Sequence, residues 1–210
     1  MRSVLISIQP KWCEKIASGE KTIELRKSHP SIECPFKCYI YCTKTKTIGD
    51  IILCKSEELT NLFGYNKIKG LNNGVANEED IHLKGKVIGE FICDRVLPVR
   101  VFENGSIQDY IFHDLKKSCV PYDEIAEYIG YDKTGYGWCI SDLIIYDTPK
   151  ELPDFAVPCL GDEKRCDKCV YYYYESSEDG AYEECCCNNL KPITRPPQSW
   201  CYTELIGDKK

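Results

Sequence analysis

The sequence has no long apolar run. The apolar stretch nearest its N-terminus, residues 4–8, is too short and too interrupted for the core of a signal peptide or for a membrane-spanning helix. We therefore expect a cytoplasmic protein with no membrane partner.

An excess of positive charge is also missing. The chain carries 27 Lys and Arg against 33 Asp and Glu, which gives a formal net charge of −6. General electrostatic attraction cannot then be the basis of binding to a polyanion such as RNA. Any contact with nucleic acid has to be local, and residues 1–50 are the most basic part, with nine Lys and Arg against five Asp and Glu.

The length excludes a large multidomain protein. At 210 residues the chain is larger than a usual single domain and shorter than two. Hydrophobic residues make up 43% of it, enough to bury a core and unlike a disordered chain. We expect a main domain over residues 1–150 and an appendage over residues 151–210, because two prolines and several charges follow an apolar run at this boundary.

Hydrophobic patterning predicts a strand-rich main domain. A short helix is expected from Pro10 to Gly19, and two more helices at residues 106–117 and 121–130. Residues 60–85 are rich in Gly and Asn and have no periodicity, so we expect a long loop there. The result is an α+β fold, a small mixed barrel with helices across its openings. Strands are predicted at residues 4–8, 21–26, 38–42, 50–55, 87–96 and 138–146.

The second predicted strand carries two charges on one face. Glu24 and Arg26 are two residues apart, so their α-carbons lie about 7 Å apart and both side chains point the same way. A carboxylate beside a guanidinium suits the edge of a base or a phosphate. Lys21, at the strand start, can reach the same cleft. Alternatively, Glu24 and Arg26 form an ion pair that only braces the sheet surface. Trp12 and Trp138 are expected to pack in the core.

The segment around these charges resembles a known family. Residues 19–26 fit the pattern Gly-x-Lys-x-x-Glu-x-Arg after a strand and a short helix, and a Gly-Trp-x-Ile strand follows at residues 137–140. Over about residues 1–147 the chain resembles the ASCH family, a branch of the PUA-like β-barrels. The resemblance implies a PUA-like barrel whose cleft, lined by Lys21, Glu24 and Arg26, binds RNA, a nucleotide or a modified nucleoside.

One group within this family is similar to amidohydrolases that remove the acetyl group from N4-acetylcytidine. In that group a lysine, a threonine and a glutamate share the chemistry. Lys21 matches the lysine, Glu24 stands at the threonine position, and the segment leading into the helix at Pro121 has no match for the glutamate. The resemblance thus implies an alternative function in which Lys21 and Glu24 are catalytic. A lysine paired with Glu24 would instead stay charged and only bind.

Cysteines are abundant and clustered. Of fifteen in the chain, seven lie beyond residue 155, where there is no histidine. A Cys-x-x-Cys pair in a polar loop, followed by further cysteines, is the spacing of a structural zinc site, which takes four cysteines where no histidine is near. Such a site stabilises a segment and leaves no open position for catalysis. Reduced, metal-free thiols are the alternative. The expected ligands are Cys159, Cys166, Cys169 and Cys186, with Cys185, Cys187 or Cys201 as substitutes for the last.

The rest of this C-terminal quarter is rich in tyrosine and proline. Tyrosines fill residues 171–174, and a proline-rich stretch at residues 193–200 is expected to lie back on the main domain, anchored by Trp200. The tail could also capture a protein partner. It resembles cysteine-rich extensions of phage and prophage ASCH-type proteins, which implies a bacterial or phage source.

Overall fold

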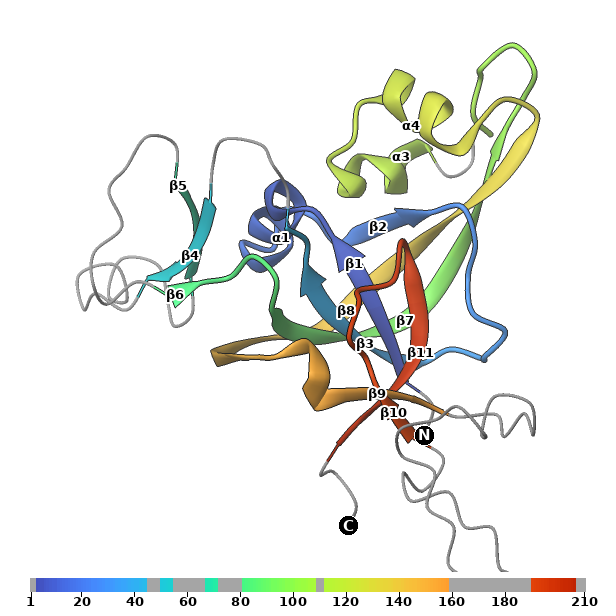
Figure 1. The fold of residues 1–210 in the computed structure, drawn as a ribbon. Coiled ribbons are helices and arrows are strands. Elements are labelled where there is room, and N and C mark those ends of the chain that lie inside the picture. Colours follow the sequence, from blue (N-terminus) through green and yellow to red (C-terminus); the bar gives the residue numbers. More distant parts are fainter. Residues whose placement is uncertain are drawn as a thin grey trace, which may run out of the picture.

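The structure, a computed structural model, describes residues 3–44, 50–54, 67–71, 81–108, 112–158 and 190–206. Most of these residues form one mixed sheet of eight strands, in the order β10-β9-β11-β1-β3-β7-β8-β2 (Figure 1). Strands β1 and β3 are parallel, and the other neighbouring strands are antiparallel. The strands are β1 (Ser3–Ile8), β2 (Ile23–Arg26), β3 (Phe36–Cys42), β7 (Val87–Val101), β8 (Lys133–Lys150), β9 (Phe155–Pro158), β10 (Leu190–Pro192) and β11 (Trp200–Leu205).

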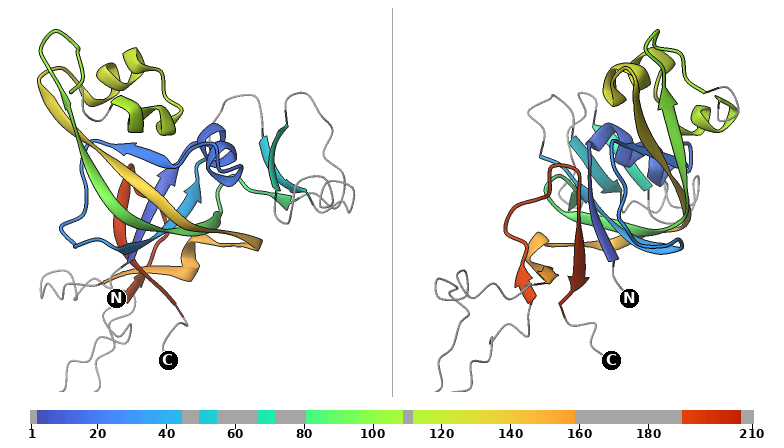
Figure 2. Two further views of the ribbon diagram at one scale, coloured as in Figure 1. Left: turned by 180° about the vertical axis from the view of Figure 1, so that it is seen from behind. Right: turned by 90° about the vertical axis from the view of Figure 1, so that its right-hand side faces the viewer.

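A few short helices and a small second sheet accompany the main sheet. The second sheet, in the order β5-β4-β6, lies beside α1 (Figures 1 and 2). Helices α3 and α4 lie together at one end of the long ribbon formed by β7 and β8 (Figure 2). Crossing a membrane would take a longer, more apolar helix than any found in the described ranges. The bounds are α1 (Pro10–Ala17), α3 (Phe112–Leu115), α4 (Tyr122–Ile129), β4 (Asp50–Cys54), β5 (Lys67–Leu71) and β6 (Ile81–His82), with 3-10 turns at Lys116–Ser118 and Leu152–Asp154.

The strand-dominated α+β fold expected from the sequence is confirmed, with two local differences. The interval 60–85, expected to be a loop, contains β5 and β6, which pair with β4. Within the range 106–117, where a helix was expected, the described residues form α3 (Phe112–Leu115) and the start of a 3-10 turn, and residues 106–108 are not helical. Ile107 instead forms an antiparallel β-bridge with Val101, and its side chain is buried beside α4.

Strand β1 is buried on both faces, and this explains its predominantly apolar sequence. Successive side chains of a strand point to opposite faces, and those of Val4 and Ile6 pack on one face in an apolar cluster with Ile16 of α1. Leu5 points the other way, into a cluster that includes Phe155 and Ile193. The second face of β1 is therefore covered by residues that lie beyond position 150.

Part of the C-terminal quarter belongs to the main sheet. Strand β11 pairs with β1, joining Ser3 to Thr203 and Ile6 to Trp200. Strand β9 pairs with β11 on one side and with β10 on the other, where Leu190 lies opposite Pro158. Pro158 and Leu190, the described residues on either side of the range 159–189, are therefore neighbours in the sheet.

The expected zinc ligands Cys159, Cys166, Cys169 and Cys186 lie outside the described residues. Within the described ranges no group of three or more His, Cys, Asp or Glu is arranged to hold a metal ion. The one alternative ligand that is described, Cys201, is a free thiol on β11, and burial raises its pKa to about 11.

Buried thiols should make the fold sensitive to alkaline pH. Burial raises the pKa of the Cys13 and Cys38 thiols well above their ordinary value of 9.0. Above that pH the unfolded chain loses protons that the folded chain keeps, so the free energy of unfolding falls by about 1.4 kcal/mol per buried thiol and pH unit. We expect urea unfolding under reducing conditions to show this loss between about pH 9 and pH 10.5.

Two alanine variants isolate the effect from other titrating groups. Cys38→Ala removes one of several buried thiols and should reduce the pH dependence by about one thiol's share, whereas Cys34→Ala, at an exposed cysteine, should change it less. An unchanged slope for Cys38→Ala would show that its buried thiol does not contribute to the alkaline loss of stability.

Candidate functional site

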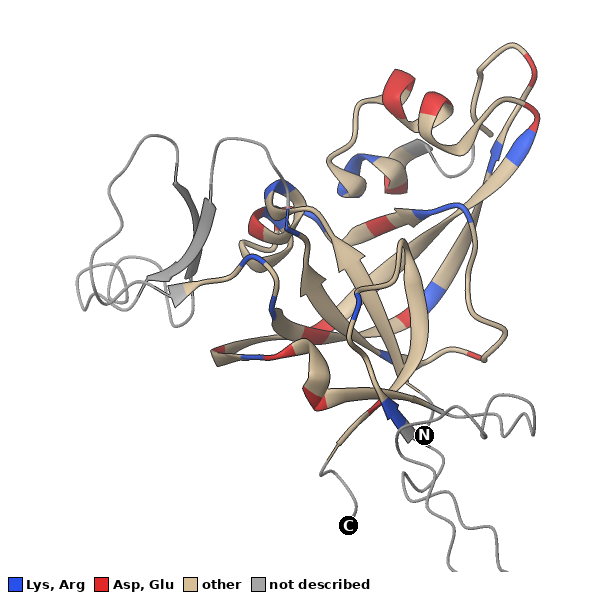
Figure 3. Cartoon of the chain, in the orientation of Figure 1, with Lys and Arg blue, Asp and Glu red and all other residues tan. Residues whose placement is uncertain are grey.

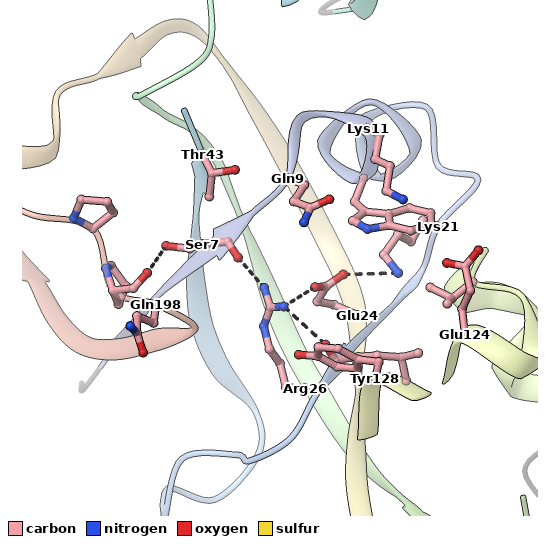
Figure 4. A pocket seen from close by; sticks show the side chains of 15 residues that line it. Ser7, Gln9, Lys11, Lys21, Glu24, Arg26, Thr43, Glu124, Tyr128 and Gln198 are labelled. Atoms are coloured by element: carbon pink, nitrogen blue, oxygen red, sulfur yellow. Dashed lines mark hydrogen bonds and ion pairs between the residues drawn. The ribbon is translucent and has the colours of Figure 1, made fainter. Parts of the chain in front are cut away.

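A pocket of about 650 Å³ opens where β1 and β2 meet α1, α4 and the strap, the name used here for residues 196–199 (Figure 4). Its lining mixes charged, polar, aromatic and proline side chains. A volume of this size is typical of sites for small organic ligands. The three motif residues singled out in the sequence, Lys21, Glu24 and Arg26, all line it.

The chain reaches this arrangement through a tight strand–helix–strand turn. Strand β1 ends at Ile8, and Pro10 occupies the first turn of α1, where its missing N–H costs nothing. The helix ends before Gly19, whose φ of +76° reverses the chain with no steric cost. Strand β2 then packs Ile23 and Leu25 against α4. Glu24 and Arg26 face the opposite way, into the pocket, as the alternation predicts.

The three motif charges form one buried ionic network. One Glu24 carboxylate oxygen lies 3.2 Å from Lys21 Nζ, and the other lies 2.9 Å from Arg26 Nη1 (Figure 4). Lys21 is 1% exposed, Glu24 3% and Arg26 9%. The ion pair considered from the sequence does form, but it lies on the floor of the pocket and not on a solvated sheet surface.

Lys21 is held by the backbone as well as by Glu24. Its ammonium group donates hydrogen bonds to the carbonyl oxygens of Ile23 at 2.8 Å and Ser118 at 2.6 Å. With Glu24 as the third partner, all three donors of the group have an acceptor. Burial lowers the pKa of Lys21, and the Glu24 carboxylate partly offsets that shift. The geometry therefore suits a charged lysine.

Arg26 joins the motif to the strap through Ser7. Arg26 Nη2 donates to the Ser7 carbonyl oxygen at 2.6 Å. Ser7 in turn donates from Oγ to the Pro197 carbonyl at 2.6 Å and from its backbone N–H to Ser199 at 2.9 Å. The proline-rich stretch thus lies back on the main domain, as the sequence predicts. Arg26 Nε is buried without a hydrogen-bond partner among the described residues.

The two tryptophans differ in their surroundings. Trp138 is wholly buried and packs edge-on against Phe36, as expected of a core residue. Trp12 is half-buried and lines the pocket, with Lys11 Nζ 4.4 Å and Lys21 Nζ 5.0 Å from its ring centroid. Trp12 therefore presents part of its ring to the pocket.

Several pocket residues were not found from the sequence. Tyr128 and Glu124 come from α4, which carries acidic residues in its first turn (Figure 3). The others come from separate parts of the chain and share no motif spacing, so the sequence offered no signal that joins them. These pocket residues are Gln9, Lys11, Thr43, Glu124, Tyr128 and Gln198.

No family model matches the sequence, and no curated protein matches it. Among solved structures, the chain is similar to the ASCH protein from Zymomonas mobilis, with 13% identity and a TM-score of 0.48, over 95% of this chain and 86% of that one. Two single-substitution variants of that protein have 12% identity and a TM-score of 0.49, over 96% and 95% of this chain and 90% and 87% of theirs. These neighbours bear the family name that the motif at residues 19–26 suggested.

Removing the central carboxylate should destabilise the fold. Glu24→Gln keeps the shape of the side chain but leaves Lys21 and Arg26 as buried cations without a counter-charge. Breaking a buried ionic network in this way costs about 3–5 kcal/mol. We expect urea unfolding to show a loss of that size.

The matched control is Glu20→Gln. Glu20 pairs with Lys15 at 2.5 Å, and both side chains are exposed, so its loss should cost under about 1 kcal/mol. If the two variants lost equal stability, the buried network around Glu24 would contribute no more to the stability of the fold than an exposed ion pair.

Proposed function

We propose that this chain is a binding module for RNA or for a modified nucleotide or nucleoside, and that the ligand occupies the pocket above Lys21, Glu24 and Arg26. The observation that carries the proposal is the network of buried charges at the base of the pocket. Three ionic side chains, nearly without exposure, lie at the base of an open pocket of about 650 Å³. Charges fixed in this way cost no reorganisation when a polar ligand enters.

Aromatic side chains at the pocket support a base as part of the ligand. Trp12 lines one wall, and Tyr128, with 39% of its surface exposed, lines another. Bases stack on such rings, and stacking is the usual way in which single-stranded nucleotides and flipped-out bases are held. A pocket with aromatic walls and a polar floor therefore fits a base better than it fits a sugar or a phosphate alone.

The charge distribution argues against strong general binding of RNA. Lys and Arg are scattered among acidic residues in Figure 3, and Glu124 brings a carboxylate to the pocket. Binding that neutralises few phosphates depends weakly on salt. The affinity should then come from the shape and hydrogen bonding of the pocket.

Glu124 supplies the observation that favours the second candidate, an amidohydrolase acting on N4-acetylcytidine-like nucleosides. The sequence showed no second carboxylate for this chemistry, yet Glu124 of α4 lines the same pocket as Lys21. In such a reaction water replaces the amine on the acetyl carbon, releasing acetate and cytidine, and a carboxylate can accept the proton of that water. We place this function second, because the ammonium group of Lys21 is occupied by three acceptors.

Binding and turnover can be separated in one experiment. The purified protein is titrated with N4-acetylcytidine and with short single-stranded RNA, and the same mixtures are analysed by chromatography. We expect saturable binding with no product, and a change of less than about tenfold in affinity between 50 and 200 mM salt, because few phosphates are contacted.

A Glu124→Gln variant distinguishes the two candidates. If cytidine appears and this variant abolishes its release while binding persists, the chain is an amidohydrolase and the first proposal is wrong about turnover. Absence of binding to every probe by a folded protein would refute the binding module.

We further propose that Cys159, Cys166, Cys169 and Cys186 hold a structural zinc ion in the segment 159–189. The paired residues Pro158 and Leu190 support this, since they bring the two ends of the segment together on the sheet. The cysteines whose side chains are described are free thiols, which fits the reducing cytoplasm that we propose for the protein. A zinc-stapled segment of this kind could present the tyrosine run to a protein partner.

Metal analysis tests the zinc proposal. We expect about one zinc per chain, and its loss in the Cys166→Ser, Cys169→Ser double variant, because tetrahedral binding fails without this pair. Cys34→Ser, at an exposed and described cysteine, is the control and should keep the metal. A metal-free protein whose segment resists proteolysis would show that the segment folds without zinc.

A further inference from the structure

The motif charges at the pocket floor have few hydrogen-bonding groups left for a ligand. The three donors of Lys21 and both carboxylate oxygens of Glu24 have partners within the chain. Arg26 uses Nη1 and Nη2 on Glu24, Leu25 and Ser7, and only its Nε has no partner among the described residues. The floor therefore supplies a charged surface, and groups elsewhere in the pocket have to distinguish one ligand from another.

Gln9 is the first side chain of the pocket that could distinguish one ligand from another. It occupies the N-cap of α1, yet its side chain makes no capping hydrogen bond. Ser, Thr, Asp and Asn are preferred at this position because their short side chains can cap the helix. A residue that breaks a local preference without structural gain is a candidate for function. The side chain is exposed, lines the pocket and has no hydrogen-bond partner among the described residues.

Gln198 is the second side chain of the pocket that is free to hydrogen-bond to a ligand. It lies in the strap between Pro197 and Ser199, and the backbone on each side of it is bonded to Ser7. These two hydrogen bonds fix the backbone that carries the Gln198 side chain, which lines the pocket and pairs with no described group. Figure 4 shows Gln9 and Gln198 on opposite sides of Arg26.

The charge of the pocket limits the class of ligand. Three cations, Lys11, Lys21 and Arg26, and two carboxylates, Glu24 and Glu124, line it, which leaves a formal charge of +1. A polyphosphate would bring several uncompensated negative charges close to the two carboxylates, and like charges in such a site repel. A ligand without a polyphosphate, such as a nucleoside or a nucleoside monophosphate, fits better.

We propose that Gln9 and Gln198 are the specificity-determining residues of the pocket and that they recognise the edge of a neutral nucleobase in a nucleoside or a nucleoside monophosphate. Each carboxamide offers a donor and an acceptor side by side, the pattern that pairs with a base edge. Because the two side chains approach from different elements, they can contact two edges of one base lying over Arg26. This inference rests on the proposed function and narrows its ligand.

Methionine variants test it, since methionine keeps the length of glutamine and removes its hydrogen bonds. Gln9→Met, Gln198→Met and the control Gln108→Met, at a glutamine outside the pocket, are titrated by calorimetry. The probes are cytidine, N4-acetylcytidine, uridine, adenosine, guanosine, AMP and ATP. We expect the unmodified chain to prefer one nucleoside, and each pocket variant to lose about tenfold in affinity for it. The double variant should bind all the nucleosides within about threefold of one another, because its base-edge hydrogen bonds are gone.

The outcomes separate this inference from the function on which it rests. If the unmodified chain binds nucleosides and the pocket variants keep its order of preference, the role of the two glutamines is refuted and the binding function stands. If ATP binds tenfold tighter than AMP, the argument from charge is wrong and so is the ligand class. If no probe binds, this inference falls, and the titration with short single-stranded RNA described above decides whether the binding function stands. The Gln108→Met variant should match the unmodified chain in every titration.

Discussion

The carboxylate of Glu24 is the constraint on which the site depends. It is almost fully buried and lies between two cations that are also buried, one just before β2 and one at its end. Neither cation could stay in that environment alone, because a buried unpaired charge is costly. Each cation also bonds to a backbone carbonyl of another segment, Ser118 in one case and Ser7 in the other. One side chain thus sets the positions of three segments around the pocket.

Ser7 extends this constraint to the C-terminal part of the chain. The residue lies near the end of β1 and is bonded through its carbonyl to Arg26, through its hydroxyl to Pro197 and through its N–H to Ser199. The strap is therefore held by the same strand that holds the arginine. Trp200 continues the connection, packing against Trp138 with ring centroids 6.0 Å apart. The pocket is a meeting point of the two ends of the described chain.

The features that were predicted correctly from the sequence are those that depend on the pattern of neighbouring residues. The alternation in residues 21–26 placed Glu24 and Arg26 on one face, and Pro10 and Gly19 marked the limits of α1. The partners of those charges could not be predicted, because Ser118 and Pro197 come near them only through the fold. The same holds for Gln9, Glu124 and Gln198, which share a pocket but no spacing. Strand β5 was missed because the residues around it are rich in Gly and Asn, which indicate turns, and the zinc cysteines stay a prediction.

Because the strap forms one wall of the pocket, the pocket is completed only late in the synthesis of the chain. A ribosome makes β1, α1 and β2 first, and these elements carry the whole charged motif. The wall formed by residues 196–199, and β11 that pairs beside β1, are made last. A nascent chain that has exposed only its first hundred residues or so therefore holds the motif without a finished pocket, and with β1 lacking one neighbour. The pocket is therefore complete only when nearly all of the described chain has left the ribosome.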